Sequence, residues 1–217
     1  MTMKKSIAVL GLGKYGMSLV RSLYEMGMDV LAVDREEMIV KEIADYCTEA
    51  VCADLEDEKS LRSLGLKDMD IAVVAIGDNL EASIFAVVAA KEQGVPLIVA
   101  KSSSERMTYI LSKVGADKVI QPEEYAGKRS AAILASENML DYFEVDDSIC
   151  MIEMLPLAEW VGKSLIDLNL RNNHRINVVA SKDDNGNWVM TDPEQPIKEN
   201  TLLLVVLEQK DLGKIRS

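Results

Sequence analysis

The chain has 217 residues, 48% hydrophobic and 28% charged, which excludes a disordered polymer and allows one large domain or two small ones. Acidic residues outnumber basic ones 36 to 24, and the formal net charge of −12 argues against nucleic-acid binding. No apolar run approaches the roughly 20 residues that span a bilayer, no signal peptide is expected, and three cysteines without a CxxC pair favour the reducing cytoplasm.

Apolar segments of strand length alternate with segments of helical periodicity through the first two thirds of the chain. The expected strands are Ser6–Leu10, Asp29–Val33, Ala50–Ala53, Ile71–Ile76, Leu97–Ala100 and Lys118–Ile120. The expected helices are Tyr15–Met26, Glu36–Tyr46, Glu58–Leu64, Leu80–Gln93 and Glu105–Val114. Repeated strand–helix–strand units predict a parallel sheet with helices on both faces, so we expect a Rossmann-like, doubly wound α/β domain.

The last third of the chain has a different pattern. A longer helix is expected at Pro122–Asp141, because proline at the first position and acids in the first turn are typical of a helix start. Short strands are then expected at Ile149–Leu155, Asn177–Ser181, Trp188–Thr191 and Leu202–Leu207, with a hairpin turn at 183–186. We therefore predict a nucleotide-binding domain with its linking helix (1–141) and a small α+β C-terminal subdomain (142–217).

The clearest motif is a glycine-rich loop between the first strand and the first helix. Gly11, Gly13 and Gly16 form a GxGxxG pattern in the strand–loop–helix context of dinucleotide-binding proteins. Gly11 permits the tight turn, Gly13 lets a phosphate approach the backbone, and Gly16 lets helix and strand pack closely. The free amides and positive dipole end of the helix predict a phosphate site on this acidic protein.

Asp34 ends the second strand, where an acid accepts hydrogen bonds from ribose hydroxyls and repels a 2′-phosphate. NADP is therefore disfavoured, although Arg35 next to it weakens that exclusion slightly. The alternative is that Asp34 only caps the helix beginning at Glu36. Lys14 also has two interpretations, as a charge beside the phosphates or as a solvated lysine on the first helical turn.

Groups for catalysis are hard to find in the sequence. His174 is the only histidine, and it lies in the tail without a Ser-His-Asp or Cys-His arrangement. No Cys/His cluster has the spacing of a zinc site. A dehydrogenase also needs a proton donor and a substrate domain, and the tail offers no obvious donor. We therefore interpret the chain as a nucleotide sensor, with no catalytic residues.

Several segments together resemble RCK domains, the regulators of potassium conductance. These segments are Ala8–Gly16, Val30–Asp34, Val73–Gly77, Gly115–Glu123 and Gly162–Arg171. The resemblance covers nearly the whole chain and is strongest to the cytosolic gating subunits of bacterial Ktr/Trk potassium uptake systems. It implies a homodimer that assembles into a ring, often octameric, under a membrane-embedded potassium-translocating subunit.

The resemblance also implies the ligands and the residues that hold them. Such subunits bind ATP, ADP or NAD-type nucleotides, and the matching cleft residues are Gly11, Gly13, Lys14, Asp34, Asp54, Ala75, Ile76 and Lys101. Asp54 lies near the expected adenine edge or caps the following helix, and Lys101 reaches phosphate or is an ordinary loop lysine. ATP-sensing relatives commonly have arginine at the position of Lys14, and lysine lacks its planar fork.

A cation and a second ligand are also implied by the resemblance. The glutamate matching Glu123 helps to bind a divalent cation, for which magnesium or calcium suits carboxylate oxygens. Glu124 is a second candidate, and the alternative is that Glu123 only complements the helix dipole. Ktr-type relatives bind cyclic di-AMP in the C-terminal subdomain. The matching residues are Ile166, Asp167, Arg171, Asn177 and Val178.

The function expected from these observations is a cytosolic regulatory subunit that gates a potassium transporter by a ligand-dependent conformational change. An NAD-dependent oxidoreductase is the first alternative, and a turnover assay that follows nicotinamide absorbance discriminates it. A soluble NADH redox sensor is the second, and it should prefer NADH over ATP in direct competition.

Overall fold

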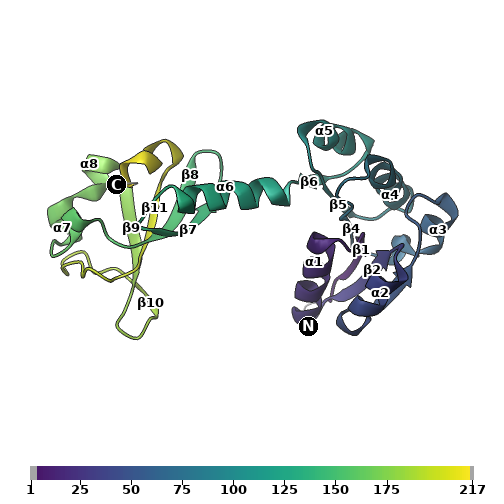
Figure 1. The fold of residues 1–217 in the computed structure, drawn as a ribbon, viewed down its shortest axis with the longest axis horizontal. Helices are drawn as coiled ribbons and strands as arrows, with labels where there is room; N and C mark the ends of the chain where they lie inside the picture. Colours follow the sequence, from purple (N-terminus) through teal and green to yellow (C-terminus); the bar gives the residue numbers. More distant parts are fainter. Residues whose placement is uncertain (1–3, 216–217) are drawn as a thin grey trace. The chain divides into compact units, whose positions relative to one another are not determined.

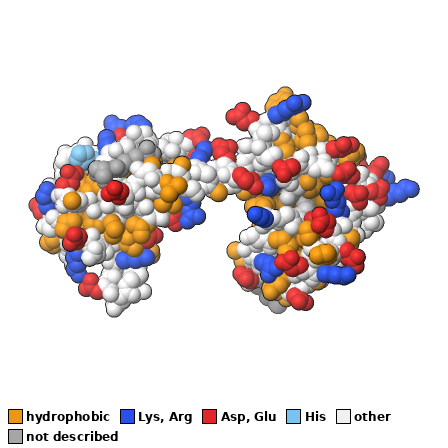
Figure 2. All heavy atoms as spheres, viewed as in Figure 1, with side chains coloured by type: hydrophobic (Ala, Val, Ile, Leu, Met, Phe, Trp, Pro, Cys, Tyr) orange, Lys and Arg blue, Asp and Glu red, His pale blue; other side chains and the backbone are white. Residues whose placement is uncertain are grey.

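The computed structural model describes residues 4–215. Its contacts divide the chain into two compact units, one ending at Glu123 and the other beginning at Glu124 (Figure 1). No helix among the described residues is long and apolar enough to cross a membrane. On the face drawn in Figure 2, basic side chains lie scattered among acidic ones and do not gather into one patch.

The first unit is built on a six-stranded parallel sheet with the strand order β3-β2-β1-β4-β5-β6. Its strands are β1 (Ser6–Leu10), β2 (Asp29–Asp34), β3 (Glu49–Cys52), β4 (Ile71–Val74), β5 (Leu97–Lys101) and β6 (Lys118–Ile120). Its helices are α1 (Lys14–Glu25), α2 (Glu37–Ile43), α3 (Glu58–Ser63), α4 (Leu80–Glu92) and α5 (Glu105–Val114), with short 3-10 turns at Ala44–Tyr46 and Leu66–Asp68. The expected doubly wound fold is confirmed.

Alternate residues of the strands face two separate helical layers. On one face, Val9 of β1 is buried with Val20 of α1 and Ile43 of α2. On the other face, Leu10 packs with residues of α3, α4 and α5, namely Leu61, Ala86 and Leu111. The chain moves outward from β1 to β3 and then returns to β4 on the other side of β1. This reversal leaves a crevice at the carboxyl ends of β1 and β4, where ligands bind in open α/β sheets.

The second unit contains a five-stranded antiparallel sheet with the order β10-β9-β11-β8-β7. Its strands are β7 (Met139–Glu144), β8 (Ile149–Met154), β9 (Ile176–Lys182), β10 (Trp188–Met190) and β11 (Leu203–Glu208). The helices are α6 (Pro122–Leu134), α7 (Leu165–Leu168) and α8 (Leu170–His174), with 3-10 turns at Ala158–Trp160 and Gln209–Ile215. Inward-facing residues such as Ile152 and Val205 form a core separate from those of the first unit. A small α+β subdomain is thus confirmed.

The expected helix Pro122–Asp141 is wrong in its second half. Helix α6 ends at Leu134, and Met139–Glu144 form β7, which pairs with β8. The turn between them is closed by the Ser136 amide, which donates to the Ile133 carbonyl at 3.3 Å. Tertiary pairing decides here, because β7 buries Met139 and Tyr142 in the core of the second unit.

The division between the units also differs from the expected boundary. The boundary expected after Asp141 falls inside β7, whereas the contacts divide the chain at the start of α6. Helix α6 groups with the second unit because Ala132 is buried in its core and Ile133 packs against that core.

Candidate functional site

The glycine-rich loop closes tightly over the end of β1. Gly11 has a φ of +97°, and a Cβ there would lie 3.0 Å from the Ile76 side chain. A Cβ on Gly16 would lie 2.0 Å from the Gly11 carbonyl oxygen. Any side chain at Gly16 therefore collides with the backbone, so the first turn of α1 sits against the loop. These contacts give the local reason for two of the three glycines in the motif.

Gly13 has a different environment from the other two glycines. It is exposed and is the N-cap residue of α1, and a Cβ there would meet nothing within 4 Å. The twelve-residue helix α1 carries no acidic residue in its first turn. Its N-terminal amides and positive dipole end are therefore open to an anion.

Asp34 fastens the glycine loop to the end of β2. Its Oδ2 accepts a hydrogen bond from the Leu12 amide at 2.7 Å, and its Oδ1 accepts one from the Glu36 amide at 3.0 Å. The N-cap residue of α2 is Glu36, so Asp34 is not the cap of that helix. Each carboxylate oxygen can accept a further hydrogen bond, so Asp34 can serve a ribose while it holds the loop.

A pocket of about 250 Å³ opens at the carboxyl ends of the central strands. Seven residues expected from the sequence line it, namely Gly11, Gly13, Asp34, Arg35, Asp54, Ala75 and Ile76. Seven further lining residues were not expected, namely Glu36, Ile39, Leu55, Glu56, Gly77, Asn79 and Ala82. Gly16, Lys14 and Lys101 lie outside this lining. Gly16 acts through the packing described above.

The residues around Asp54 form a short chain of hydrogen bonds along the pocket wall. Asp54 Oδ1 accepts from the Glu56 amide at 3.0 Å, and Asn79 Nδ2 donates to Glu56 Oε1 at 2.5 Å. Asn79 Oδ1 in turn caps α4 by accepting from the Ala82 amide. The cap of α3 is Asp57, so Asp54 does not cap that helix. An asparagine before the helix at Leu80 was the available signal for Asn79.

The two expected lysines lie in different surroundings. Lys14 is the first residue of α1 and is exposed. Lys101 ends β5, and its side chain is only 11% exposed. Its Nζ lies 2.6 Å from Glu123 Oε1 and 3.4 Å from where a Cβ on Gly77 would stand. The Lys101 ammonium is therefore buried beside the Gly77 side of the pocket.

Glu123 lies in the first turn of α6, and its side chain is 67% exposed. The hydrogen bond from Lys101 holds the pKa of this carboxyl below its ordinary value. Among residues 4–215, no group of three or more His, Cys, Asp or Glu side chains is arranged to hold a metal ion. The cation role of Glu123 stays a prediction, as does that of Glu124, which pairs with Lys128 at 3.0 Å.

Comparison with known proteins identifies the family of this two-unit chain. The TrkA-N domain family matches residues 7–122, and the TrkA-C domain family matches residues 151–217. The chain belongs to the TrkA family. Its TrkA-N domain therefore contains the glycine-rich loop, the pocket and Lys101.

Relatives and solved structures with matching sequence or fold cover nearly all of this TrkA-family chain. Ktr system potassium uptake protein C of Bacillus subtilis is 37% identical over 98% of this chain and 96% of its own length. Ktr system potassium uptake protein A of the same organism is 35% identical over 98% and 96%. The GsuK RCK domain matches 99% of this chain and 47% of its own, with a TM-score of 0.67 and 15% identity. A GsuK channel structure bound to NAD has a TM-score of 0.66 at 14% identity, over 99% of this chain and 39% of its own.

The five residues expected to bind a second ligand lie in the second unit, which contains the TrkA-C domain. Ile166 and Asp167 are on α7, Arg171 is on α8, and Asn177 and Val178 are on β9. Asp167 forms a capping box with Ser164, whose Oγ donates to Asp167 Oδ2 at 2.7 Å. Its carboxylate therefore already has a structural partner, while Ile166 and Arg171 are exposed.

Proposed function

We propose that this TrkA-family protein is a nucleotide-sensing regulatory subunit of a potassium uptake system. Two relatives that align over nearly its full length are named as Ktr system potassium uptake proteins. The feature that carries the nucleotide role is the pocket where the open N-terminus of α1 faces the Asp34 carboxylate. An anion-binding helix end next to a ribose acceptor is the arrangement that an adenosine diphosphate group requires.

The groups on the two sides of the pocket indicate the class of ligand that we propose. Asp34 and Asp54 supply acceptors for ribose and adenine at the ends of β2 and β3, while Gly11 and Gly13 leave room for phosphates at α1. ATP, ADP and NAD(H) share this adenosine diphosphate group. The solved GsuK channel bound to NAD has the same fold. A 2′-phosphate would meet the Asp34 carboxylate, so NADP is disfavoured.

The rest of the proposal concerns what nucleotide binding does. The protein acts without catalysis, because binding alone biases one of two conformations, and a coupling of about 1–3 kcal/mol is enough for regulation. Its partner is a membrane-embedded potassium-translocating subunit on whose cytoplasmic side it docks. It forms a homodimer that assembles into a ring.

The test is calorimetric titration of the purified full chain with ADP, ATP and NADH. Gly13→Asp places a carboxylate where the phosphates approach, in a position where a side chain meets no neighbour. We expect it to lower nucleotide affinity at least tenfold, about 1.4 kcal/mol or more. The matched control is Gly127→Asp on α6, where a side chain also meets nothing, and it should bind as the wild type does.

The same two variants can be compared by measuring potassium uptake in cells that carry this chain and its membrane partner. Potassium uptake with the Gly127→Asp variant should depend on nucleotide as it does with the wild type. With the Gly13→Asp variant this dependence should be lost. Equal nucleotide affinity of the wild type and Gly13→Asp would place the site elsewhere. Absence of any affinity in the wild type would end the proposal.

Cyclic di-AMP binding by the second unit is a separate proposal. It rests on Arg171, whose guanidinium can pair with a phosphate through two hydrogen bonds. Titration with labelled cyclic di-AMP tests it, and Arg171→Gln should abolish the signal. Absence of binding by the wild type at micromolar ligand would end this proposal and leave the nucleotide role of the first unit untouched.

A further inference from the structure

The ion pair between Lys101 and Glu123 lies at the edge of the candidate pocket. Lys101 Nζ and Glu123 Oε1 are 2.6 Å apart, and the ammonium lies next to Gly77, which lines the pocket. A Cβ on Gly77 would stand 3.4 Å from this ammonium, so the glycine leaves the space next to the charge open. Lys101 is thus a largely buried cation that pairs with the Glu123 carboxylate next to a residue of the pocket wall.

The two partners of this ion pair differ in how well solvent can stabilise their charges. The Lys101 side chain is only 11% exposed, so an anionic partner stabilises its charge more than water does. The Glu123 side chain is 67% exposed and lies in the first turn of α6, so water and the helix dipole can stabilise its carboxylate alone. Breaking the ion pair therefore costs Glu123 little free energy, and the charge of Lys101 is compensated if another anion takes the place of Glu123.

The position of β5 in the sheet indicates which part of a ligand would take that place. Strands β2 and β3 lie on one side of β1, and β4 and β5 lie on the other (Figure 1). Asp34 ends β2 and Asp54 follows β3, whereas Lys101 ends β5. An adenosine held at Asp34 therefore directs its phosphate chain past Gly13 and toward Gly77. The group that arrives near Lys101 is the phosphate farthest from the adenosine.

We propose that Lys101 exchanges partners, leaving Glu123 for the terminal phosphate of a bound nucleoside polyphosphate. This inference rests on the proposed nucleotide site and adds to it a competing anion within the chain. Glu123 acts as an internal competitor that lowers phosphate affinity. Binding frees its carboxylate in the first turn of α6, the helix that leads into the second unit.

Because Glu123 competes with phosphate for Lys101, Glu123→Gln should increase nucleotide affinity and not decrease it. Removing a carboxylate that holds Lys101 should raise ADP affinity about threefold to fivefold, the range for a partly exposed ion pair. The matched control is Glu124→Gln, which removes the same charge from the same helical turn but breaks the pair with Lys128 instead. It should change ADP affinity less than twofold.

The experiment is titration calorimetry of the full chain with ADP and with adenosine, in EDTA so that no divalent cation contributes. Lys101→Met should lower ADP affinity by about tenfold to a hundredfold, as expected for a lost bond to a charged group. In the Lys101→Met background, Glu123→Gln should have no further effect. Adenosine, which has no phosphate, should bind wild type and Glu123→Gln alike.

An unchanged or lower ADP affinity of Glu123→Gln in EDTA would overturn the exchange while leaving the nucleotide site intact. A gain that persists in the Lys101→Met background would also overturn it, because Glu123 would then act without Lys101. No binding of ADP by the wild type would overturn the proposed function and this inference with it. Since Glu123 is a surface residue, the decisive comparison does not depend on a buried substitution.

Discussion

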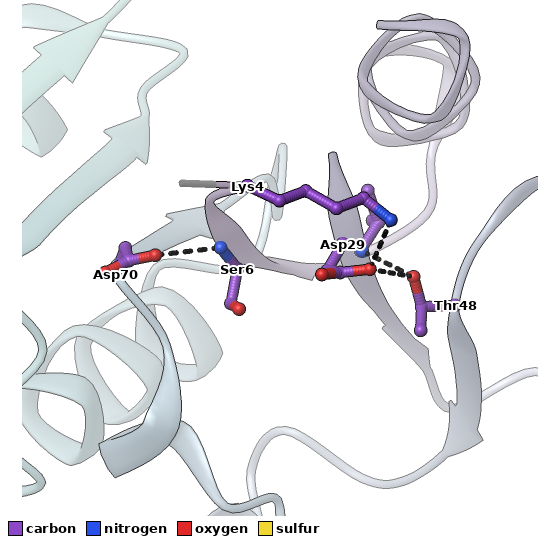
Figure 3. Close-up of polar contacts among 6 residues, drawn as sticks. Lys4, Ser6, Asp29, Thr48 and Asp70 are labelled. Atoms are coloured by element: carbon purple, nitrogen blue, oxygen red, sulfur yellow. Dashed lines mark hydrogen bonds and ion pairs between the residues drawn. The ribbon is translucent and has the colours of Figure 1, made fainter. Parts of the chain in front are cut away.

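The six-stranded sheet carries aspartates at both ends of its strands, at the amino edge, where the strands begin, and at the carboxyl edge, where they end. These aspartates make different contacts at the two edges. At the amino edge, polar groups bind one another (Figure 3). Asp29 Oδ1 accepts from Lys4 Nζ at 2.6 Å and from Thr48 Oγ1 at 3.3 Å, and the Asp70 carboxylate accepts from the Ser6 amide at 2.9 Å. These contacts tie neighbouring strands together, so the carboxylates at this edge already have partners within the chain.

At the carboxyl edge, aspartates also accept backbone amides, but they border an open pocket. Asp34 holds the Leu12 amide and Asp54 holds the Glu56 amide, and both line the cavity. The difference is made by the glycine-rich loop, in which Gly13 puts no side chain at the N-cap of α1. Aspartate chemistry alone therefore does not mark a binding site. The backbone around it decides whether the carboxylate remains open to a ligand.

The largest expected effect is on the unfolding free energy, at Gly16, where the carboxyl edge has no room for a side chain. Gly16→Ala puts a Cβ 2.0 Å from the Gly11 carbonyl oxygen and should lower the unfolding free energy of the first unit by about 3 kcal/mol. Urea unfolding followed by circular dichroism measures this. The two tryptophans, Trp160 and Trp188, lie in the second unit, so their fluorescence should not move.

A glycine with free space around it is the control for this substitution. Gly127→Ala on α6 should raise the unfolding free energy by about 0.5–1 kcal/mol, because alanine restricts the unfolded chain more than glycine does. Equal stabilities of Gly16→Ala and the wild type would mean that α1 does not pack against the loop.

Replacing one aspartate at each edge tests the comparison itself. Asp34→Ala and Asp70→Ala each remove a carboxylate that accepts a backbone amide, so each should lower stability by about 1–3 kcal/mol. Only Asp34→Ala should also weaken ADP binding, by about 1.5–3 kcal/mol for the lost ribose bonds. Calorimetry of both variants checks this. Equal loss of ADP affinity in Asp70→Ala would break the distinction between the edges.

Lys14→Ala should have a smaller effect on binding. Lys14 is exposed on the first turn of α1, so we expect ATP affinity to fall by about 1.5 kcal/mol, the lower end for bonds to charged groups. The control is Lys4→Ala at the amino edge, which removes the same charge and should leave ATP binding unchanged. Unchanged ATP affinity in Lys14→Ala by calorimetry would remove Lys14 from the site.

The smallest effect concerns the pH dependence of the amino edge. The hydrogen bond from Lys4 holds the pKa of the Asp29 carboxyl below its ordinary value. Its contribution to stability is therefore present above the unfolded pKa of about 3.9 and is lost as pH falls through the folded pKa. Asp29→Asn should melt below the wild type at pH 6, and this gap should narrow below pH 3. A pH-independent gap would contradict the assignment.

The sequence predicted the first unit well because its signals are local. The β1 and β6 strands and the α5 helix have the bounds expected, and the other strands of this sheet end within two residues of the prediction. Buried parallel strands are continuous apolar runs, and three of the intervening helices, α3, α4 and α5, begin at the side-chain caps Asp57, Asn79 and Ser104. The β7 strand was missed because its pairing with β8 outweighs the helical pattern that runs on from α6.

The site was predictable only where it is formed by one segment. The glycine loop and Asp34 carry their own signals, whereas the Glu56–Asn79 hydrogen bond joins residues 23 positions apart. The Lys101–Glu123 pair likewise depends on β5 and β6 lying side by side, with Lys101 opposite Ile120. Such contacts follow from strand register, which is set by the whole sheet and not by the pattern near either residue.

Hydrogen–deuterium exchange of the full chain, with and without ADP, tests the central claim most directly. Nucleotide bound at the carboxyl edge should slow exchange of the amides at 11–16, 34–36 and 75–77. The amides of Ser6 and Asp29 at the amino edge should exchange at the same rate in both samples. Slowed exchange at the amino edge alone, or no change at the glycine loop with saturating ADP, would contradict the account.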